Sequence, residues 1–170
     1  AKRSDVKYYL DPNNFINDKR QAFQFLDLRH FTGDPINELK ALLDGKGSLH
    51  GTESFFSNAA KRSKINELYL ISHALLETGN GESRLAKGVE VGKDKNGNLV
   101  LVNSSNKASL RDVKKTYNMF GIGAIDSCPL ECGAKRAYKE GWFSVEQAIL
   151  GGAEFAKNNY IYSGQNTLYK

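Results

Sequence analysis

The sequence predicts an α+β fold that is mostly helical and is organised around one central helix, with a small β-hairpin beside it. Three observations support this: a strongly apolar stretch at residues 66–77, amphipathic helical patterns on both sides of it, and a change of period at residues 89–102. The chain has 170 residues, which is enough to bury one proper core. We therefore expect residues 1–170 to form a single domain.

The central helix is expected in the segment NELYLISHALLETGNG, residues 66–81. Apolar side chains occur on nearly every side of this pattern, which is typical of a buried helix. Asn66 stands where an N-cap residue belongs, and Gly79 is well placed as the left-handed residue that closes the helix. We expect this helix to form the middle of the core.

The segments around it give further helical patterns. Asp34 and Pro35 read as the cap and first residue of a helix, and Ser144 with Gln147 forms a capping box. The pair Gly151-Gly152 indicates either close packing of that last helix or a weak point in it. Helices are expected, in chain order, over residues 19–28, 34–43, 52–61, 81–87, 129–140 and 144–157. Residues 1–18 are expected to be an extended, irregular arm, and residues 160–170 a polar tail.

The period changes after the central helix. Two β-branched runs, at residues 89–91 and 99–102, flank an Asn96-Gly97 pair, which is a strong hairpin signal. Residues 109–117 fit either a helix or a third strand. Residues 118–126 are punctuated by glycine, and we expect them to border a cleft between a helical lobe and the hairpin lobe.

Composition narrows the classes of partner. The net charge of +5 favours an anionic partner such as cell wall, nucleic acid or lipid headgroups. No zinc-finger, RNA-recognition or helix-turn-helix signature supports nucleic acid. No apolar run is long enough to span a membrane, and residues 1–12 lack the apolar core of a signal peptide. If the protein is secreted, we expect this chain to be a mature or excised domain, and we expect a monomer.

Two cysteines and three histidines give no metal site. Cys128 and Cys132 form one short spacing, whereas a structural zinc needs four ligands and the histidines are scattered. The two cysteines fit either a local disulfide or a pair of free thiols. We therefore expect no metal and no cofactor.

Glu77 is the residue most suited to catalysis. It is the last strong acid before the central helix stops, so it faces the negative end of the helix dipole. Burial and the dipole both disfavour its charged form, so we expect its pKa to be raised. Such a carboxyl is what a general acid needs near neutral pH. The alternative is a solvated acid at a helix end.

Two motifs together resemble a known family. The segment SHALLETGNGESRLAKG, followed by YNMFGIGAID, is similar to glycoside hydrolase family 73, the endo-β-N-acetylglucosaminidase domain of bacterial autolysins. The resemblance runs from about Phe23 to Lys170. It implies a lysozyme-like fold, cleavage after N-acetylglucosamine in peptidoglycan, no cofactor, and secretion or attachment to the cell wall. It also implies that Glu77 is the general acid.

The resemblance implies a further acid on or near the hairpin. Glu90 is our candidate, and Asp94 and Asp112 compete with it. Glycosidases commonly use two carboxylates, whose separation sets the stereochemical outcome. The acetamido group of the substrate could replace the second carboxylate as nucleophile. The sequence leaves these alternatives open.

Other residues are candidates for binding sugar. Tyr117, Asn118, Phe120 and Gly121 match the Tyr-Asn-x-Phe-Gly motif of the family. A glycine lets the main chain approach a sugar closely, and Asn118 offers a donor and an acceptor to an acetamido group. Tyr117 and Phe120 could equally be core aromatics.

The remaining candidates are aromatic or imidazole side chains. Trp142 could stack on a sugar or pack at a helix end, and His73, four residues before Glu77, could hydrogen-bond near the acid or be an ordinary core histidine. Many family members continue into a Tyr-Ala-Thr-Asp stretch that this chain lacks. Tyr160 or Tyr162 could serve in its place.

Three other functions remain open. A lytic transglycosylase or muramidase of the same fold would also use one principal glutamate but would cut the other linkage. A non-catalytic wall-binding module would bind wall without lysing it. A nucleic-acid binder would show affinity that falls steeply with salt.

Overall fold

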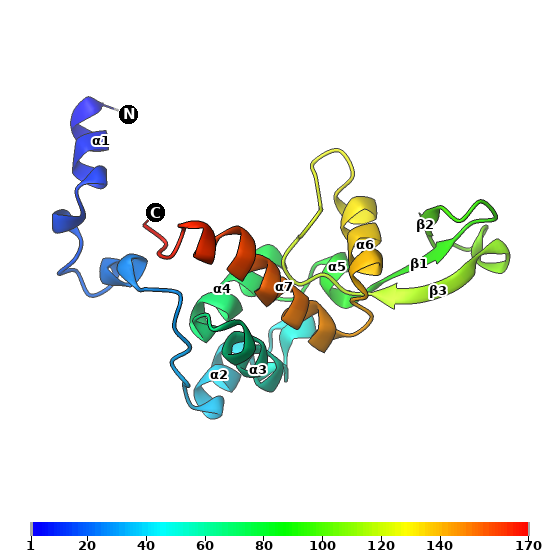
Figure 1. The fold of residues 1–170 in the computed structure, drawn as a ribbon, viewed down its shortest axis with the longest axis horizontal. Coiled ribbons are helices and arrows are strands. Elements are labelled where there is room, and N and C mark those ends of the chain that lie inside the picture. The colour runs from blue at the N-terminus through cyan, green and yellow to red at the C-terminus, as the bar shows by residue number, and fades with distance from the viewer. Residues whose placement is uncertain (1, 170) are drawn as a thin grey trace.

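The computed structural model describes residues 2–169 and has an elongated shape (Figure 1). The N-terminal arm lies at one end, the sheet at the other, and the helical body between them. The α-helices are α1 (Arg3–Leu10), α2 (Ile36–Leu43), α3 (Glu53–Ser63), α4 (Glu67–Glu77), α5 (Arg84–Lys87), α6 (Pro129–Glu140) and α7 (Val145–Asn159). The strands are β1 (Val89–Lys93), β2 (Leu99–Leu101) and β3 (Arg111–Thr116). The predicted α+β class is confirmed.

The predicted hairpin is present and gains a third strand. The strands form one antiparallel sheet in the order β2-β1-β3, with Val91 opposite Leu101 on one side and Lys114 on the other. Gly97 turns the hairpin with a φ of 84°. Residues 109–117, which fitted either a helix or a strand, contain β3. The sheet has helix α6 packed against all three strands.

The N-terminal segment differs from the prediction. Residues 1–18 were expected to be an irregular arm, but Arg3–Leu10 form helix α1, in which the Lys2 N–H donates to the Asp5 carboxylate at 3.3 Å. None of the residues of α1 is buried, and the apolar face formed by Val6, Tyr9 and Leu10 stays exposed. Residues 19–28 also differ, because they contain a short 3₁₀ helix, Gln21–Phe25, in place of an α-helix.

Helix α4 begins and ends where the sequence predicts. Asn66 caps it by accepting the Tyr69 N–H at 2.9 Å, and Gly79 follows its end with a φ of 56°. The prediction of a helix buried on nearly every side is wrong. Leu70 and Ile71 are buried, but Leu76 is 79% exposed. One face of α4 lies in the core, and the other borders a groove. Residues from both ends of the chain line this groove without filling it, so that face stays open.

The core lies within the helical body. Helix α3 is at its centre and packs against α2, α4 and α7. The largest fully buried apolar side chains include Phe56, Leu39, Leu43, Leu49, Ile65, Leu70, Ile71 and Ile149. In residues 2–169 no helix is long and apolar enough to cross a membrane.

Of the two alternatives left open for Gly151 and Gly152, close packing or a weak point, the structure has close packing. A Cβ atom on Gly151 would lie 2.1 Å from the Trp142 indole nitrogen, and one on Gly152 would lie 2.0 Å from the Phe120 ring. Both aromatic rings therefore lie directly on the backbone of α7. This contact fixes the loop that carries Phe120.

Glu67, the first residue of α4, is a buried acid that the sequence analysis did not single out. Its residue exposure is 0%, and its carboxylate accepts the N–H groups of Thr32, Gly33 and Asp34 at 3.0, 2.7 and 2.8 Å. Burial alone would raise the pKa of Glu67, but these hydrogen bonds outweigh it and the pKa is lowered. Glu67 thereby ties the segment before α2 to the start of α4.

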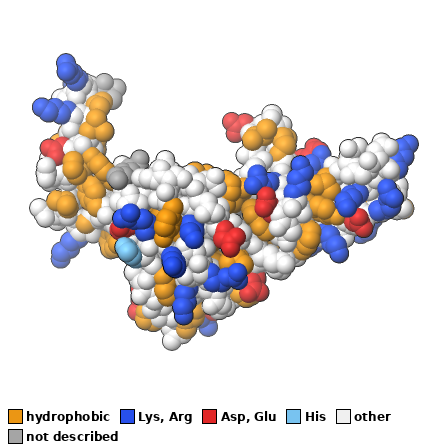
Figure 2. Space-filling model, viewed as in Figure 1, with side chains coloured by type: hydrophobic (Ala, Val, Ile, Leu, Met, Phe, Trp, Pro, Cys, Tyr) orange, Lys and Arg blue, Asp and Glu red, His pale blue; other side chains and the backbone are white. Residues whose placement is uncertain are grey.

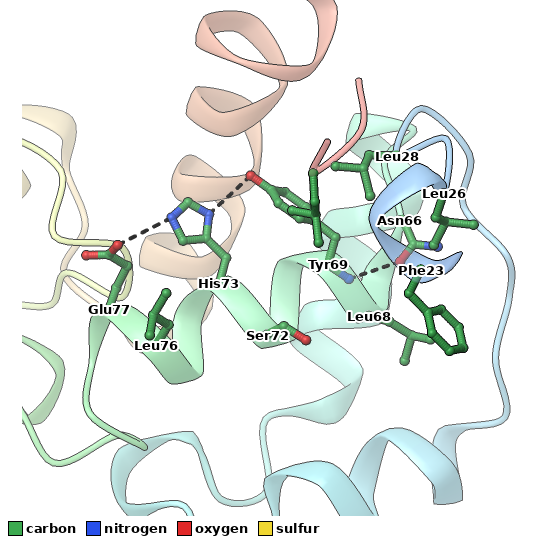
Figure 3. A pocket seen from close by; sticks show the side chains of 11 residues that line it. Phe23, Leu26, Leu28, Asn66, Leu68, Tyr69, Ser72, His73, Leu76 and Glu77 are labelled. Atoms are coloured by element: carbon green, nitrogen blue, oxygen red, sulfur yellow. Dashed lines mark hydrogen bonds and ion pairs between the residues drawn. The ribbon is translucent and has the colours of Figure 1, made fainter. Parts of the chain in front are cut away.

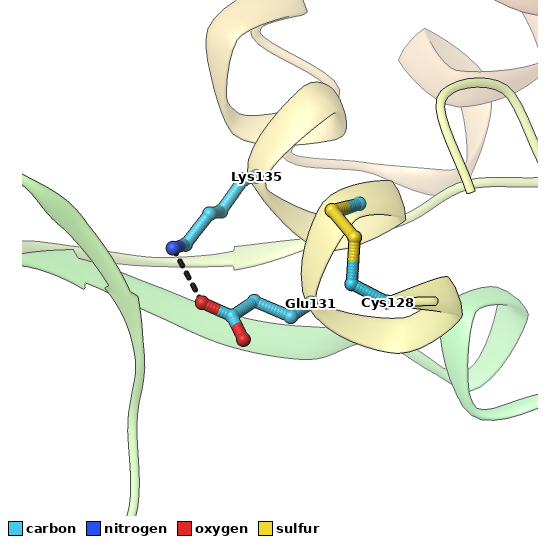
Figure 4. The surroundings of a disulfide bond; sticks show 4 residues. Cys128, Glu131 and Lys135 are labelled. Carbon is cyan, nitrogen blue, oxygen red and sulfur yellow. Dashed lines mark hydrogen bonds and ion pairs between the residues drawn. A yellow bond between two sulfur atoms is a disulfide. The ribbon is translucent and has the colours of Figure 1, made fainter. Parts of the chain in front are cut away.

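Cys128 and Cys132 form a disulfide at the start of α6 (Figure 4). Of the two alternatives left open by the sequence, the structure has the disulfide. Next to it, Lys135 and Glu131 form an ion pair one helical turn apart.

The contact between α7 and Phe120 leads to a prediction for Gly152→Ala. The added methyl must displace the Phe120 ring, and such overpacking costs about 1–3 kcal/mol. The gain in helix propensity offsets only about 1 kcal/mol of this. We expect Tm to fall by several degrees in calorimetry, whereas Glu154→Ala, at an exposed position of the same helix, keeps Tm near the native value. An unchanged or higher Tm for Gly152→Ala would contradict the packing described here.

The hydrogen bonds of Glu67 lead to a prediction for Glu67→Gln. A neutral amide cannot accept three N–H groups as a carboxylate does, and hydrogen bonds to charged groups contribute about 1.5–3 kcal/mol each. We expect the free energy of unfolding at pH 7 to fall by at least about 2 kcal/mol in urea titrations.

The effect of Glu67→Gln should depend on pH. Because the folded pKa lies below the unfolded one, the stabilisation is full above the ordinary glutamate pKa of 4.5 and is lost as pH falls through the folded value. The difference between native protein and variant should therefore shrink between pH 5 and acid pH. Glu38→Gln, at an exposed acid of α2, is the control. A difference that stays constant with pH would rule out the ionised carboxylate.

Candidate active site

Glu77 is the last residue of α4 and points out of the helical body. The next residue, Thr78, closes the turn: its hydroxyl donates to the Ala74 carbonyl at 2.6 Å and accepts the Gly81 N–H at 2.8 Å. The side chain of Glu77 is 40% exposed, so the expected burial of this acid is wrong. The chain turns away at Thr78 and leaves the carboxyl in the open.

Two hollows meet at Glu77. The first, which we call the apolar groove, has a volume of about 540 Å³ and runs along the outer face of α4 (Figure 3). It is lined by Phe23, Leu26, Leu28, Asn66, Leu68, Tyr69, Ser72, His73, Leu76, Glu77 and Leu168. The second, the small cavity, has a volume of about 280 Å³. It is lined by His73, Glu77, Phe120, Gly121, Ile122, Gly123, Ala124, Gly152, Phe155, Ala156 and Tyr160. His73 and Glu77 line both hollows.

One residue of the Tyr-Asn-x-Phe-Gly motif, Gly121, lies against Glu77, and a second, Phe120, lies against His73. A Cβ atom on Gly121 would be 3.0 Å from Oε2 of Glu77, and its φ of 61° suits glycine. Phe120 is largely buried and contacts the His73 ring edge to face, with centroids 5.5 Å apart. The main chain at Gly121 therefore lies against the acid, whereas its approach to a sugar, which the motif predicts, stays a prediction.

Asn118 lies elsewhere than the motif suggested. Its side chain is buried, where the amide nitrogen donates to the carbonyls of Ile122 and Gly133, and the oxygen accepts the N–H groups of Phe120 and Ile122. All of these partners are main-chain atoms of the protein. Direct contact with an acetamido group is therefore not available to Asn118. It holds the loop in shape instead.

The other aromatic candidates separate into two groups. Tyr160 lines the small cavity and is partly exposed. Trp142 is 5% exposed and packs against Gly151, which corresponds to the helix-end packing that the sequence left open, and it lines neither hollow at Glu77. Tyr117 is half-buried beside Lys115, outside the residues that line either hollow.

The three acids of the sheet differ in how firmly they are held. Glu90 is 47% exposed, and its nearest cation is the Lys107 ammonium at 3.8 Å. Asp94 accepts the N–H groups of Asn98 and Asn96 within the hairpin turn, and these bonds lower its pKa. Asp112 pairs with Lys93 at 3.0 Å, which lowers its pKa. None of the three lines the two hollows at Glu77.

His73 and Tyr69 form a polar row with Glu77 on α4. The Tyr69 hydroxyl lies 3.3 Å from Nδ1 of His73, and Nε2 of His73 lies 3.7 Å from Oε1 of Glu77. Burial lowers the pKa of His73, and the Glu77 carboxylate offsets part of this. The spacing of four residues was visible in the sequence for His73, but Tyr69 was counted only as an apolar residue.

Several groove residues carried no signal in the sequence. Phe23, Leu28 and Leu168 come from the two ends of the chain and meet α4 only through tertiary folding. Within the described residues, 2–169, no group of three or more His, Cys, Asp or Glu side chains could hold a metal ion.

Comparison with known proteins identifies relatives of the whole chain. A Bacillus subtilis (strain 168) Beta-N-acetylglucosaminidase is 47% identical over 174 residues, which cover 100% of this chain and 18% of the relative. The crystal structure of Major Bifunctional Autolysin matches with a TM-score of 0.77 and 41% identity, covering 100% of this chain and 63% of that one.

A catalytic mutant of S. aureus Autolysin E, solved in complex with the disaccharide NAG-NAM, matches with a TM-score of 0.67. It is 32% identical, and the match covers 99% of this chain and 64% of that one. The chain thus spans less than two thirds of each of these relatives.

A family model confirms the resemblance seen in the two sequence motifs. The model of the glucosaminidase family, described as mannosyl-glycoprotein endo-beta-N-acetylglucosaminidase, matches residues 53–170. That range contains Glu77, both hollow-forming helices α4 and α7, and the sheet. The chain belongs to the glucosaminidase family.

Proposed function

We propose that this chain is the catalytic domain of a peptidoglycan hydrolase that cleaves the β-1,4 bond after N-acetylglucosamine, with Glu77 as general acid. One observation carries the proposal: the carboxyl of Glu77 lies where two hollows meet, with the Gly121 backbone against one of its oxygens. Hollows on both sides of one acid suit a polymer that continues beyond the bond being cut.

The substrate class rests on the relatives. Autolysin E has been solved with the disaccharide NAG-NAM, and this chain shares its fold over 99% of its own length. The basic side chains support an anionic wall as partner, since Lys and Arg are spread over the visible face and the net charge is +5 (Figure 2). The Cys128–Cys132 disulfide suits an oxidising location outside the cell. We propose that the chain acts at the cell wall as a monomer.

The role of Glu77 is to give its proton to the glycosidic oxygen as the bond from that oxygen to the N-acetylglucosamine carbon breaks. A glycan lying in both hollows would cover the exposed carboxyl and exclude water from it. Desolvation favours the neutral form of a carboxyl, which is the form that carries the proton. Water then completes the hydrolysis at the sugar carbon.

For the second catalytic group of the reaction we propose two alternatives, a carboxylate of the sheet or the acetamido group of the substrate. Among the sheet acids, Glu90 is the least engaged, because Asp94 shapes the turn and Asp112 is paired with Lys93. A role for Glu90 requires that the substrate or the sheet bring it towards the sugar. The acetamido group of the substrate is the alternative nucleophile.

The binding roles follow from what each side chain can reach. Phe120, Gly121 and Tyr160 line the small cavity and are proposed to contact sugar there. Asn118 is proposed to act by shaping that loop, and Trp142 by packing against Gly151. Tyr117 is proposed to contact a sugar only beyond the two hollows.

The first prediction for this function is loss of activity in Glu77→Gln. The amide keeps the shape of the side chain but carries no transferable proton, and general acid catalysis contributes about 10²- to 10⁴-fold. We expect lysis of purified wall to fall by at least about 100-fold with an unchanged Tm. Glu82→Gln, at an exposed acid in the next loop, should lyse wall as the native protein does.

The products of the same digest separate the related functions. Mass spectrometry should find N-acetylglucosamine at the reducing ends. Muramic acid or anhydro-muramic ends would support a muramidase or a lytic transglycosylase. Binding to wall without any lysis by the native chain would support a non-catalytic module, and near-native lysis by Glu77→Gln would remove the acid from this role.

The second prediction concerns Glu90→Gln. If Glu90 is the second carboxylate, the variant loses at least about 100-fold in kcat on soluble glycan fragments. Asp112→Asn tests its competitor, since asparagine tolerates the left-handed backbone at that position, where φ is 51°. Native kinetics in Glu90→Gln would mean that the second acid is Asp94 or Asp112, or that none is needed and the acetamido group of the substrate is the nucleophile.

A further inference from the structure

The outer face of α4 carries three polar side chains in a row, one turn apart (Figure 3). Residues four apart on a helix share a face, so Tyr69, His73 and Glu77 follow one another along it. The hydroxyl of Tyr69 lies 3.3 Å from Nδ1 of His73, and Nε2 of His73 lies 3.7 Å from Oε1 of Glu77. The imidazole therefore connects a phenol to the acid.

We propose that His73 is a positioning residue: as a neutral imidazole it directs its Nε2–H at Oε1 of Glu77, and the Tyr69 hydroxyl fixes this tautomer by donating to Nδ1. This inference rests on the proposed role of Glu77 as the acid. The inference gives a role to His73 and Tyr69, which have no part in the proton transfer proposed for Glu77.

The surroundings of His73 favour the neutral ring. Its side chain is only 21% exposed and lies between two aromatic rings, Tyr69 with centroids 5.6 Å apart and Phe120 with centroids 5.5 Å apart. The titratable groups around it are Tyr69 and Glu77 on α4 and Tyr160 after α7. Glu77 favours the charged imidazole, but burial outweighs it, so the pKa of His73 is lowered.

The two hydrogen-bonding partners of His73 together favour one tautomer. A neutral imidazole has one N–H and one bare nitrogen, and the phenol of Tyr69 can donate its proton only to a bare nitrogen. If Nδ1 accepts from Tyr69, the proton of the ring is on Nε2, the nitrogen that faces Glu77. An ionised Glu77 carboxylate can only accept, so it favours the proton on Nε2, and the Tyr69 hydroxyl, which can donate or accept, then donates to the bare Nδ1.

The two oxygens of Glu77 have different neighbours. Oε1 is the one nearest to His73, and Oε2 is the one beside Gly121. An N–H held towards Oε1 leaves Oε2 to carry the proton to the substrate. After that proton has moved to the glycosidic oxygen, the same N–H stabilises the carboxylate that remains. The separation of 3.7 Å is long for a hydrogen bond, but catalytic hydrogen bonds often tighten when substrate binds.

Nitrogen-15 NMR tests the tautomer without any assay of activity. The chain has three histidines, and the signals of His73 are those missing from the spectrum of His73→Gln. At pH 7 we expect a neutral ring with its proton on Nε2. In Tyr69→Phe we expect the signals to move towards a mixture of tautomers. A ring protonated on Nδ1, or charged at pH 7, would overturn the proposal.

Kinetics test the positioning role. We expect His73→Leu to lower kcat on soluble glycan fragments by about 10- to 100-fold, because a misplaced catalytic group loses up to about 100-fold, with KM changed less than about twofold. His73→Gln should recover most of this loss, because its side-chain amide can present an N–H near the place of Nε2. Tyr69→Phe should fall between His73→Gln and His73→Leu.

Matched controls come from the same chain. Tyr9→Phe removes an exposed hydroxyl of helix α1, at the far end of the molecule from the sheet, and His50→Gln replaces an exposed imidazole that accepts the Gly45 N–H. Both should keep native kcat.

The outcomes separate the two proposals. If all three variants of Tyr69 and His73 have native kcat while Glu77→Gln is inactive, the positioning role is wrong and the role of Glu77 as general acid is retained. If Glu77→Gln is also active, the proposed function itself fails. Should His73→Leu not fold, His73→Gln and Tyr69→Phe still decide the outcome.

Discussion

The surroundings of Glu77 depend on one contact, in which the Phe120 ring packs on the backbone of α7 at Gly152. No other residue fits at that position without moving the ring, since a Cβ atom would lie 2.0 Å from it. Phe120 in turn packs against His73, and the next residue, Gly121, lies against Glu77. The geometry at the end of α4 therefore depends on Gly152 having no side chain, although Gly152 lies more than seventy residues further along the chain than Glu77.

This contact changes the interpretation of the Tyr-Asn-x-Phe-Gly motif in this chain. From the sequence, each of its residues was a candidate for touching sugar. In the structure Asn118 is buried and bonded to four main-chain groups, and Phe120 fills the space between α7 and His73. Only Gly121 lies beside the acid. The motif mainly builds a loop that brings a backbone to Glu77, a task that composition and spacing alone do not reveal.

Local signals predicted most of the fold and the place of Glu77 at the end of the central helix. The cap at Asn66, the turn at Gly97 and the start of α6 at Pro129 follow from a few neighbouring residues, and all three are where the sequence puts them. The failures have tertiary causes. The open face of α4 and the groove beside it depend on Phe23 and Leu168, which no local pattern connects to α4. Helix α1 is eight residues long and buries none of them, so the short apolar pattern of Val6, Tyr9 and Leu10 did not distinguish it from an irregular arm.

The two ends of α4 show how strongly environment decides what a glutamate does. Glu67 and Glu77 are the first and last residues of one helix. Glu67 is fully buried, and three backbone N–H groups hold it ionised, so it anchors a loop. Glu77 lies in the open, with a half-buried imidazole on one side and a glycine backbone on the other. Anchoring one end of the helix keeps the other end in place, because a rigid α4 transmits that position to the carboxyl. A general acid must be held rigidly in position, but it need not be buried in the free protein, because bound substrate can exclude water from it.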